Sequence, residues 1–378
     1  MNIVILDLGF VLIFVFRISD LTKMAATGGV RTLLQKTIDL NASDLHLTVG
    51  APPILRVRGD LTPVPAAEIL GPEQVEQLIF ELVSDEQKDL LLTQKEIDFS
   101  FAYGEEARFR VNAFHQRGFL AASLRRIPLK IPSLEELNLP GVLSEFCNLP
   151  QGFILITGPT GHGKSTTIAA MIQRINETRP VHIVTIEDPI EYIFPHEKSL
   201  VDQREMHMDT FSWEVALRSA LREDPNVVMI GEMRDYETIA SAITIAETGH
   251  LVFATLHTNS ASQTVDRVID AFPETQQQQV RVQLASILEG VIAQRLVPSV
   301  QGALVPAVEI MLPSPAVRSI IREGKTHQLD NVIATSFDQG MVSLERALAQ
   351  LVNDGKLDPQ VAKLHAIHPE EVTRLIKQ

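Results

Sequence analysis

The stretch that decides the fold of this chain reads Gly158-Pro159-Thr160-Gly161-His162-Gly163-Lys164-Ser165-Thr166. It fits the pattern G-x-x-x-x-G-K-[ST], in which residues without bulk let several backbone N–H groups approach a triphosphate. A helix that starts directly after the loop turns its positive end toward the phosphates. We expect Lys164 to place its charge on the β- and γ-phosphates, and the hydroxyl of Ser165 to bind Mg²⁺.

The residues around this loop support the same interpretation. Residues 153–156 (Phe-Ile-Leu-Ile) form an apolar run typical of a buried strand. After the loop, apolar side chains fall at helical spacing: Ile168, Met171, Ile172 and Ile175. A strand, loop and helix in this order predict a nucleoside triphosphate site and not a merely structural glycine turn. We expect His162 to be a spacer, because the loop acts at that position through its backbone.

Composition limits the remaining possibilities. A length of 378 residues favours about two domains, and 45% hydrophobic residues can build real cores. The net charge of −14 argues against a protein that binds nucleic acid backbones non-specifically, so we expect no nucleic acid partner. A single cysteine, Cys147, excludes an intrachain disulfide and a four-cysteine zinc site, and it fits a reducing cytoplasm.

The N-terminal extension, residues 1–24, is apolar from residue 3 to residue 16 apart from Asp7 and Gly9. That run is too short for a spanning helix, and it has neither the positive start nor the cleavage site of a secretory signal. Three interpretations stay open: a true start at Met24, a segment that touches a membrane, or an extra packed strand or helix. We favour the start at Met24, because the recognisable chain begins after it.

Residues 25–126 show an α+β pattern. A helix is predicted over residues 30–40 and helical spacing continues over residues 72–92. Strand-like runs cover residues 44–47, 54–58, 98–101 and 108–114, and Gly104 marks a hairpin turn. The pattern predicts a small domain in which helices cover a sheet. Residues 127–150 form a linker region that begins with a proline-punctuated segment, residues 127–132, across which the two domains could shift.

Residues 151–378 alternate strands with helices, which predicts an α/β domain with a parallel-rich sheet and crossover connections. Strands are predicted over residues 182–186, 226–230 and 250–256, and helices over residues 213–221, 236–247 and 262–272. The last part, residues 313–378, has a charged helical pattern.

Acidic residues follow two of these predicted strands. Glu232 comes just after the strand that ends at Ile230, where it could orient or deprotonate the attacking water and help to hold Mg²⁺ through water. Glu187, Asp188 and Glu191 follow the other strand, and crowded carboxylates of this kind are favoured near a cation. A solvated acidic loop is the alternative for this second group.

Two histidines flank the strand over residues 251–256. His250 and His257 are seven positions apart, which is about 23 Å along an extended strand, so both cannot touch one γ-phosphate. His257, at the carboxyl end, is the better candidate for sensing that phosphate. His250 is more suited to an interface or to packing.

Before any family is considered, several functions are compatible with these residues. One is an ATP-driven motor that remodels a protein target, and another is a nucleotide-dependent switch or a small-molecule phosphotransferase. No element with acceptor chemistry for a phosphotransferase is recognisable. A nucleic-acid motor would need a basic path with aromatic residues, and aromatic residues make up 5% of the chain.

Ordered blocks of sequence then add a resemblance. These blocks are residues 42–47 (ASDLHL), 108–114 (RFRVNAF), 158–166, 185–191 (TIEDPIE), 203–205 (QRE), 216–225 (ALRSALREDP), 231–235 (GEMRD) and 248–258 (TGHLVFATLHT). Together they resemble the secretion ATPases of type II secretion and type IV pili, and most closely the retraction ATPases of twitching motility. The resemblance covers nearly everything after Met24.

The resemblance implies a PAS-like first domain, a RecA-like second domain and a hexameric ring that binds ATP between the domains and beside the neighbouring subunit. It implies that residues 158–166 are the Walker A loop and that Glu232 is the Walker B catalytic glutamate. It also assigns Glu191, with Glu187 and Asp188, to the Asp box, and His250 and His257 to the His box. Arg110 and Arg125 match the family's arginine fingers, catalytic residues that compensate transition-state charge.

The implied function is ATP hydrolysis that drives pilus retraction. The implied partner is an inner-membrane platform protein, and a second retraction ATPase is a further candidate; the implied location is the cytoplasmic face of the inner membrane. Two residues depart from the family pattern: His162 replaces a serine, and Ser319 replaces an asparagine in a C-terminal helix tied to retraction. An accessory retraction role therefore stays open. An assembly or secretion role is disfavoured, because such ATPases usually carry a four-cysteine zinc motif.

Overall fold

The structure, a computed structural model, describes residues 29–376 except residues 58, 105–106 and 128–129. The chain divides into two compact units, and the boundary in the sequence lies between Ile127 and Pro128. The predictions for the N-terminal extension lie outside the described residues. Among the described residues, none of the helices has the length and apolar character needed to cross a membrane.

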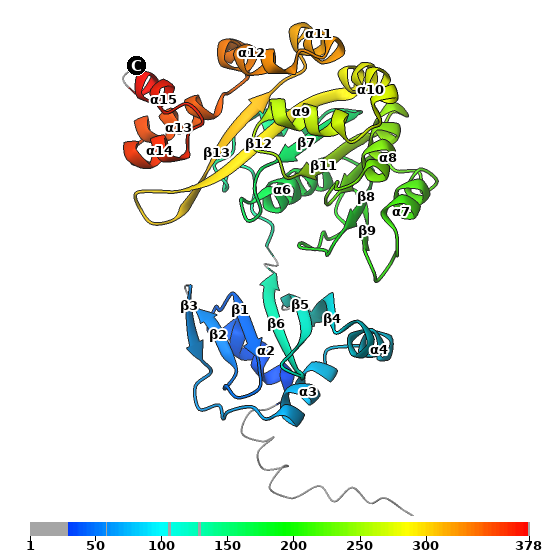
Figure 1. The fold of residues 1–378 in the computed structure, drawn as a ribbon, viewed down its shortest axis with the longest axis vertical. Coiled ribbons are helices and arrows are strands. Elements are labelled where there is room, and N and C mark those ends of the chain that lie inside the picture. Colours follow the sequence, from blue (N-terminus) through cyan, green and yellow to red (C-terminus); the bar gives the residue numbers. More distant parts are fainter. Residues whose placement is uncertain (1–28, 58, 105–106, 128–129, 377–378) are drawn as a thin grey trace, which may run out of the picture. The chain divides into compact units, whose positions relative to one another are not determined.

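The first unit contains one antiparallel sheet with the strand order β3-β2-β1-β6-β5-β4 (Figure 1). Its strands are β1 Asp44–Leu47, β2 Ile54–Val57, β3 Asp60–Pro63, β4 Glu96–Tyr103, β5 Ala107–Gln116 and β6 Phe119–Ile127. Its helices are α2 Val30–Asp39, α3 Pro72–Phe80 and α4 Asp85–Gln94. All three helices pack on one face of the sheet, where Leu33, Val75 and Leu91 meet Phe109 and Leu124 in a common core.

Two details of this unit follow from local sequence. The strict alternation in β5 puts Phe109, Val111 and Ala113 into the core and leaves the arginines of the strand on the opposite face. The predicted helical stretch over residues 72–92 is in fact two helices. It is interrupted because Ser84 caps α4 by accepting a hydrogen bond from the N–H of Gln87, whose side chain accepts one in return.

The second unit contains a sheet with the strand order β13-β12-β7-β11-β10-β8-β9. Its strands are β7 Gly152–Thr157, β8 His182–Glu187, β9 Leu200–Glu205, β10 Val227–Ile230, β11 Leu251–Leu256, β12 Leu288–Pro298 and β13 Leu304–Met311. All neighbours run parallel except β12 and β13, which form an antiparallel hairpin. The predicted parallel-rich α/β fold is confirmed, although no strand was predicted for β9, β12 or β13.

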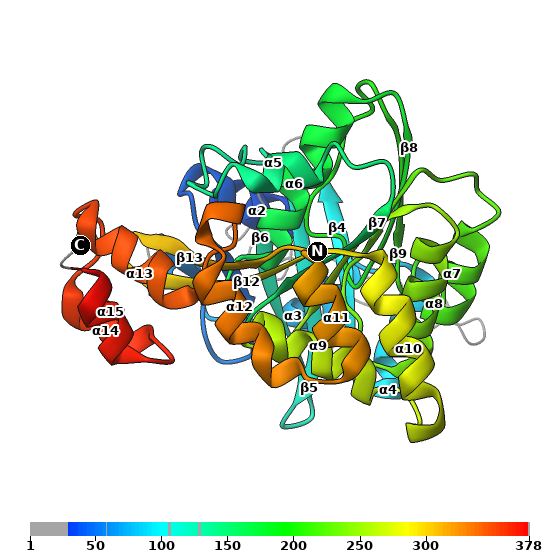
Figure 2. The same ribbon diagram turned by 90° about the horizontal axis from the view of Figure 1, so that it is seen from above.

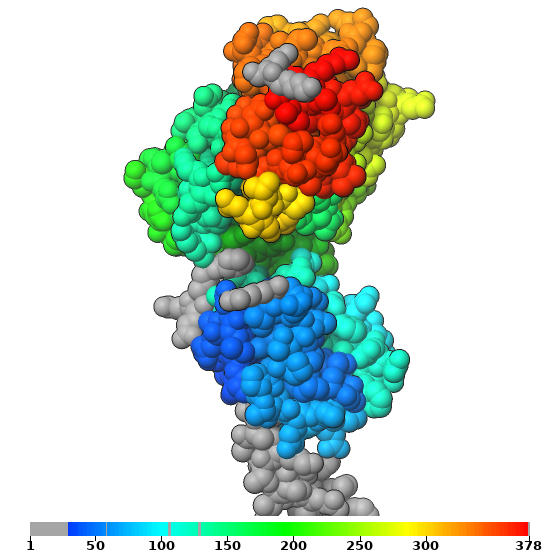
Figure 3. Space-filling view, turned by 90° about the vertical axis from the view of Figure 1, so that its left-hand side faces the viewer, coloured from blue at the N-terminus to red at the C-terminus, as the bar shows by residue number. Residues whose placement is uncertain are grey.

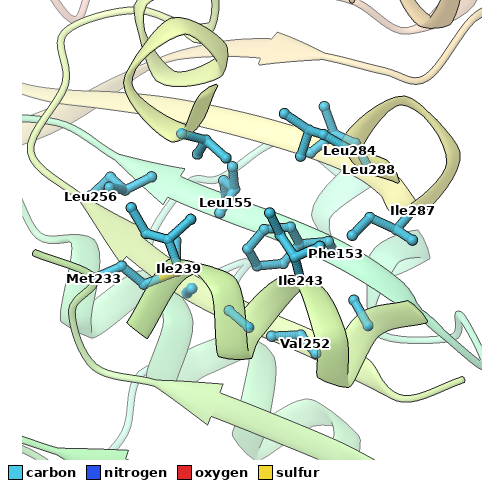
Figure 4. Close-up of a cluster of buried hydrophobic side chains, with 14 of the residues drawn as sticks. Phe153, Leu155, Met233, Ile239, Ile243, Val252, Leu256, Leu284, Ile287 and Leu288 are labelled. Atoms are coloured by element: carbon cyan, nitrogen blue, oxygen red, sulfur yellow. The ribbon is translucent and has the colours of Figure 1, made fainter. Parts of the chain in front are cut away.

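Helices cover both faces of this sheet, as Figure 2 shows. They are α5 Val142–Phe146, α6 Lys164–Thr178, α7 Trp213–Ala220, α8 Tyr236–Glu247, α9 Ala261–Asp270, α10 Glu274–Ile287, α11 Pro315–Glu323 and α12 Leu329–Thr335. One core joins the sheet to α7–α12, and the close-up in Figure 4 shows Phe153 and Leu155 of β7 against Ile239 and Ile243 of α8. The other core joins the opposite face to α5 and α6. The sheet is therefore buried on both sides, which explains its continuous apolar strands.

The predicted linker region is shorter in the structure than residues 127–150. Leu134, Leu143 and Phe146 are buried in the core that also contains α6, so most of this segment belongs to the second unit. Cys147 lies there too and is fully buried, and burial raises the pKa of its thiol to about 12. Cys147 is therefore a packed residue of the core.

The C-terminal part is helical, as predicted, and ends with α13 Leu344–Asn353, α14 Pro359–His365 and α15 Pro369–Leu375. These three helices form a small core with the far end of the β12–β13 hairpin through Val297, Ala307, Leu348 and Val372. In Figure 3 they form a compact group (orange to red) beside the yellow hairpin tip. One strand of the hairpin, β12, pairs with β7. The hairpin thus connects this helical group to the central strands of the sheet.

Candidate nucleotide site

The Walker-type loop, residues 158–166, connects β7 to α6. The carboxyl ends of β7, β8, β10 and β11 lie at the same edge of the sheet, because these strands are parallel and in register. Glu187, Glu232 and His257 come from the ends of three of these strands. The topology alone therefore gathers the predicted loop, carboxylates and one histidine at one edge.

The conformation of the loop requires glycine at its first position. Gly158 has φ of 143°, and a Cβ there would lie 2.2 Å from the carbonyl oxygen of Gln294 in β12. A side chain would therefore be strained by its backbone angle and would collide with a neighbouring strand. The loop is pressed against β12, a strand for which sequence analysis made no prediction.

Lys164 is buried at the start of α6 and turns back over the loop. Its Nζ donates to the carbonyl oxygens of Gly158 (2.7 Å) and Pro159 (3.0 Å) and lies 3.5 Å from Nδ1 of His257. Burial lowers the pKa of Lys164, and the carboxylates of Glu232 and Glu191 partly oppose this. The ammonium group is thus held where the loop begins, with two carboxylates near enough to influence it.

Glu232 and His257 form the bridge between the strand ends and the loop. Nε2 of His257 lies 3.0 Å from Oε1 of Glu232, and Nδ1 of the same ring lies 3.4 Å from Oγ1 of Thr160. One imidazole therefore contacts the predicted catalytic carboxylate on one side and the loop on the other. This is the position expected for a group that responds to the terminal phosphate.

Arg234 also holds Glu232, in a bidentate pair. Its Nε lies 2.8 Å from Oε1 and its Nη2 donates to Oε2 at 2.8 Å. Burial raises the pKa of Glu232, but the hydrogen bond from Arg234 and the nearby His257 outweigh it, so the pKa ends below its ordinary value. The group is a carboxylate at neutral pH and can accept a proton from water. No role was predicted for Arg234 from the sequence, although its position two residues after Glu232 is a usable signal.

The three carboxylates of the predicted Asp box are not equivalent. Glu187 is buried and accepts hydrogen bonds from Oγ1 of Thr185 (2.6 Å) and Nε2 of Gln203 (3.0 Å). Burial raises the pKa of Glu187 to about 7. Asp188 instead acts electrostatically on Arg234, and Glu191 acts on Lys164. Glu187 is thus held by side chains of β8 and β9, whereas Asp188 and Glu191 lie near enough to act on the cations of the site.

The structure does not bring His250 to this edge. It precedes β11 at the amino end, and its Nδ1 lies 2.9 Å from the carbonyl oxygen of Ile245 and 3.1 Å from Oγ1 of Thr248. This agrees with the separation expected from the sequence. A catalytic role for His250 stays a prediction that this unit alone does not support.

Arg110 and Arg125 lie in the first unit, where they are direct cross-strand partners in β5 and β6. Arg125 pairs in turn with Asp44 of β1, and Asp44 pairs with Arg56 of β2. Nε of Arg125 lies 2.9 Å from Oδ1 of Asp44, and Nε of Arg56 lies 3.7 Å from Oδ2. We call these four residues, Arg56, Asp44, Arg125 and Arg110, the arginine row.

The residues present fit a nucleotide-bound Mg²⁺. Such an ion takes most of its ligands from phosphates and water and needs one or two protein oxygens. The hydroxyl of Ser165 could provide a protein oxygen, and Glu232 could hold a water ligand. In the part of the chain that the structure describes, no group of three or more His, Cys, Asp or Glu side chains is arranged to hold a metal ion. A dedicated protein cage is not required for this kind of site.

Comparison with known proteins identifies the family. A family model described as "Type II/IV secretion system protein" matches residues 99–335. The type IV pilus retraction ATPase PilT of Pseudomonas aeruginosa is 46% identical over 341 residues, which cover 90% of this chain and 99% of the relative. The chain belongs to the type II/IV secretion system protein family. It is an ATPase, as its relatives in this family are.

Two further relatives sharpen the likeness. The type IV pilus ATPase PilU of Pseudomonas aeruginosa is 40% identical over 91% of this chain and 90% of the relative. A crystal structure of the pilus retraction motor PilT with bound ADP superimposes with a TM-score of 0.86, at 45% identity, covering 92% of this chain and 99% of that chain. The fold predicted from the family resemblance is thereby confirmed along nearly the whole chain.

Proposed function

We propose that this ATPase is the motor that drives retraction of a type IV pilus. Glu232 supports this proposal most directly: it is ionised, held by Arg234, and joined through His257 to the phosphate-binding loop. The full-length likeness to PilT directs the hydrolysis toward retraction. ATP with Mg²⁺ is the proposed substrate, and a homohexamer at the cytoplasmic face of the inner membrane is the proposed working form.

The mechanism assigns a role to each group in the site. Backbone N–H groups of residues 158–166 and Lys164 bind the phosphates, and Mg²⁺, when bound, neutralises part of the phosphate charge. Glu232 accepts a proton from the attacking water, while His257 and Arg234 fix the orientation of its carboxylate. Arg110 and Arg125 belong to the first unit of a chain in the ring, and they compensate charge in the transition state.

Work would come from a change in the angle between the two units across residues 127–132. In the proposed ring this motion acts on an inner-membrane platform protein, so that pilin subunits leave the base of the fibre. The placement of Arg110 and Arg125 on one unit and Glu232 on the other supports such a coupling, because turnover then depends on how the units are arranged.

Purified chain with ATP and Mg²⁺ tests the enzymatic part. We expect a ring by analytical ultracentrifugation, steady phosphate release, and loss of nucleotide binding in Lys164→Ala. A chain that stays monomeric with ATP and releases no phosphate would refute the proposal. A deletion strain tests the direction of work, since excess surface pili indicate retraction and bald cells indicate assembly.

One observation favours an accessory retraction role as a second candidate. Ser319, which replaces the asparagine of the retraction helix, lies on α11 and donates to Oε1 of Glu323 at 2.9 Å, within its own helix. The similarity to PilU points the same way. Complementation of a retraction-deficient strain with wild type and Ser319→Asn would separate the two roles: a motor retracts pili alone, and an accessory protein needs a second ATPase.

A further inference from the structure

The strand β12 supports the phosphate-binding loop from behind. It runs parallel to β7, with Ala293 opposite Thr157, so that the next residue, Gln294, lies against the start of the loop. A Cβ on Gly163 would lie 2.9 Å from Nε2 of Gln294, just as one on Gly158 would meet its carbonyl oxygen. Two glycines of the loop therefore have this one residue as their close neighbour.

Gln294 uses both ends of its buried amide to join two parts of the loop region. Its Nε2 donates to the carbonyl oxygen of His162 at 2.8 Å, and its Oε1 accepts from Oγ1 of Thr167 at 2.7 Å. The residue is 3% exposed, so neither bond has water as a ready substitute. The middle of the loop and the first turn of α6 are thus held by one side chain.

His162 adds a second connection to the same strand. Its Nδ1 accepts a hydrogen bond from the backbone N–H of Leu296 at 3.0 Å. Because a backbone N–H can only donate, Nδ1 must carry no proton, and the ring in this arrangement is neutral with its proton on Nε2.

The surroundings of the ring favour its neutral form. Burial lowers the pKa of His162, and the charged or titratable groups that act on the ring are Lys164 of α6, Arg295 of β12 and His365 of α14. Arg295 is fixed beside it, since its Nη1 donates to the carbonyl oxygen of His365 at 2.9 Å. Protonation would turn Nδ1 into a donor facing the N–H of Leu296 and would break the connection.

We propose that His162 and Gln294 are positioning residues that hold the phosphate-binding loop against β12, and that the contribution of His162 is lost when its ring is protonated. We call these two residues the clip. This inference rests on the proposed nucleotide site and deepens it. The sequence interpretation of His162 as a spacer changes accordingly, because its ring and its carbonyl group both bind β12.

The clip matters for affinity because the loop binds phosphate through backbone N–H groups that must already point inward. A loop released from β12 has to be ordered when the nucleotide binds. Loss of one hydrogen bond of this kind is worth roughly fivefold to tenfold in the dissociation constant.

The first experiment measures the dissociation constant of a fluorescent ADP derivative with Mg²⁺ at pH 8. His162→Asn is the conservative variant, since its Oδ1 can take the place of Nδ1, and His162→Ala removes the acceptor. We expect His162→Asn to bind within about twofold of wild type and His162→Ala to bind roughly fivefold to tenfold more weakly. Equal affinity of all three proteins would overturn the role of the ring.

Gln294 is tested by two variants, because Gln294→Leu could fail to fold. Thr167→Val removes only the bond from Thr167 to the amide, and thermal melting without nucleotide shows that the variant is folded. We expect weaker ADP binding, by roughly fivefold, with little change in melting temperature. Unchanged affinity in a folded Thr167→Val protein would remove the Thr167 bond from the proposal, and unchanged affinity in a folded Gln294→Leu protein would remove Gln294 itself.

The pH profile separates positioning from simple packing. Dividing the wild-type affinity by the His162→Asn affinity at each pH cancels the effect of the titration of ADP itself. We expect the ratio to stay near one above pH 6.5 and to fall as the pH drops through the lowered pKa of the ring. A flat ratio, or tighter wild-type binding in acid, would contradict the proposal. His365→Asn serves as a matched control for removal of a nearby titratable ring.

Lys164→Ala distinguishes failure of this inference from failure of the proposed function. If Lys164→Ala abolishes ADP binding while the His162 and Thr167 variants bind like wild type, the nucleotide site stands and the clip is wrong. If Lys164→Ala binds like wild type, the proposed nucleotide site itself is wrong.

Discussion

Two buried carboxylates, one in each unit, have pKa values shifted in opposite directions. Asp44 of the arginine row is buried, and burial alone would raise its pKa, but the Ser43 hydroxyl and Arg125 outweigh this and hold the pKa below its ordinary value. Glu187 in the second unit has a hydroxyl and an amide as hydrogen-bond donors, and burial raises its pKa to about 7. The difference is that a cation lies beside Asp44, whereas the hydrogen-bond donors to Glu187 are neutral.

The same contrast distinguishes the two regions as wholes. At the nucleotide site, Glu232 is paired with Arg234 and His257, and Lys164 with backbone carbonyls, so charges are matched within the unit. The arginine row has three arginines and one carboxylate, and the side chain of Arg125 is 72% exposed. Like charges directly opposite each other in a sheet are unfavourable. The described cations of the nucleotide site thus have partners within the unit, whereas Arg125 presents a largely exposed side chain opposite a second arginine.

The largest expected effect comes from the nucleotide site. Glu232→Gln keeps the shape of the side chain but removes its ability to accept a proton, so we expect ADP affinity within about twofold of wild type and no steady-state phosphate release. A turnover assay and the binding titration measure the two halves. Normal turnover in this variant would end the assignment of Glu232.

The arginine row should affect turnover and not the binding of ADP. Arg110→Ala with Arg125→Ala removes charge that acts in the transition state, which is expected to lower kcat by about 10³-fold. Arg126→Ala is the matched control, because Arg126 neighbours Arg125 and bonds instead to Oδ1 of Asn41 at 3.0 Å. If the control loses as much activity as the double variant, the row has no special role.

Asp44 should have a smaller effect on the same step. Asp44→Asn removes the charge that holds Nε of Arg125 while keeping the side-chain shape. We expect kcat to fall by roughly tenfold, as for loss of one charge-assisted hydrogen bond, with ADP affinity unchanged. A fall in ADP affinity that matches the fall in kcat would show that the first unit had been disrupted more widely.

The smallest expected effect is on folding stability, whose pH dependence should distinguish Glu187 from Asp44. With a raised pKa, Glu187 holds its proton in the folded state, so its contribution is present below pH 4.5 and is lost as the pH rises through about 7. Glu187→Gln should therefore be more stable relative to wild type at pH 8 than at pH 5, by about 3 kcal/mol at most. Chemical denaturation at both pH values measures this difference.

Asp44 should show the opposite sign in the same experiment. Its lowered pKa means that its contribution is present above its ordinary value and is lost as the pH falls below it. Asp44→Asn should therefore cost stability at neutral pH, and this cost should shrink in acid. Parallel pH profiles for Asp44→Asn and Glu187→Gln would contradict the contrast between the two regions.

Local patterns in the sequence predicted much of this arrangement. The loop over residues 158–166, the apolar runs of β7, β10 and β11, and the alternation in β5 each depend on neighbours in the chain, so their periodicity could be recognised. Parallel strand order then placed Glu232 and His257 at the loop, and the spacing of His250 from His257 correctly separated those two residues.

Pairings between distant residues were decided only by the tertiary structure. The bond between Gln294 and His162 joins positions 132 apart, and the row from Arg56 to Arg110 depends on the register of four strands. The spacing of residues along the chain does not reveal such partners, because hydrogen bonds between distant segments have no fixed separation in the sequence. The sequence by itself determined which residues could bind phosphate; packing against β12 decided how their loop is held.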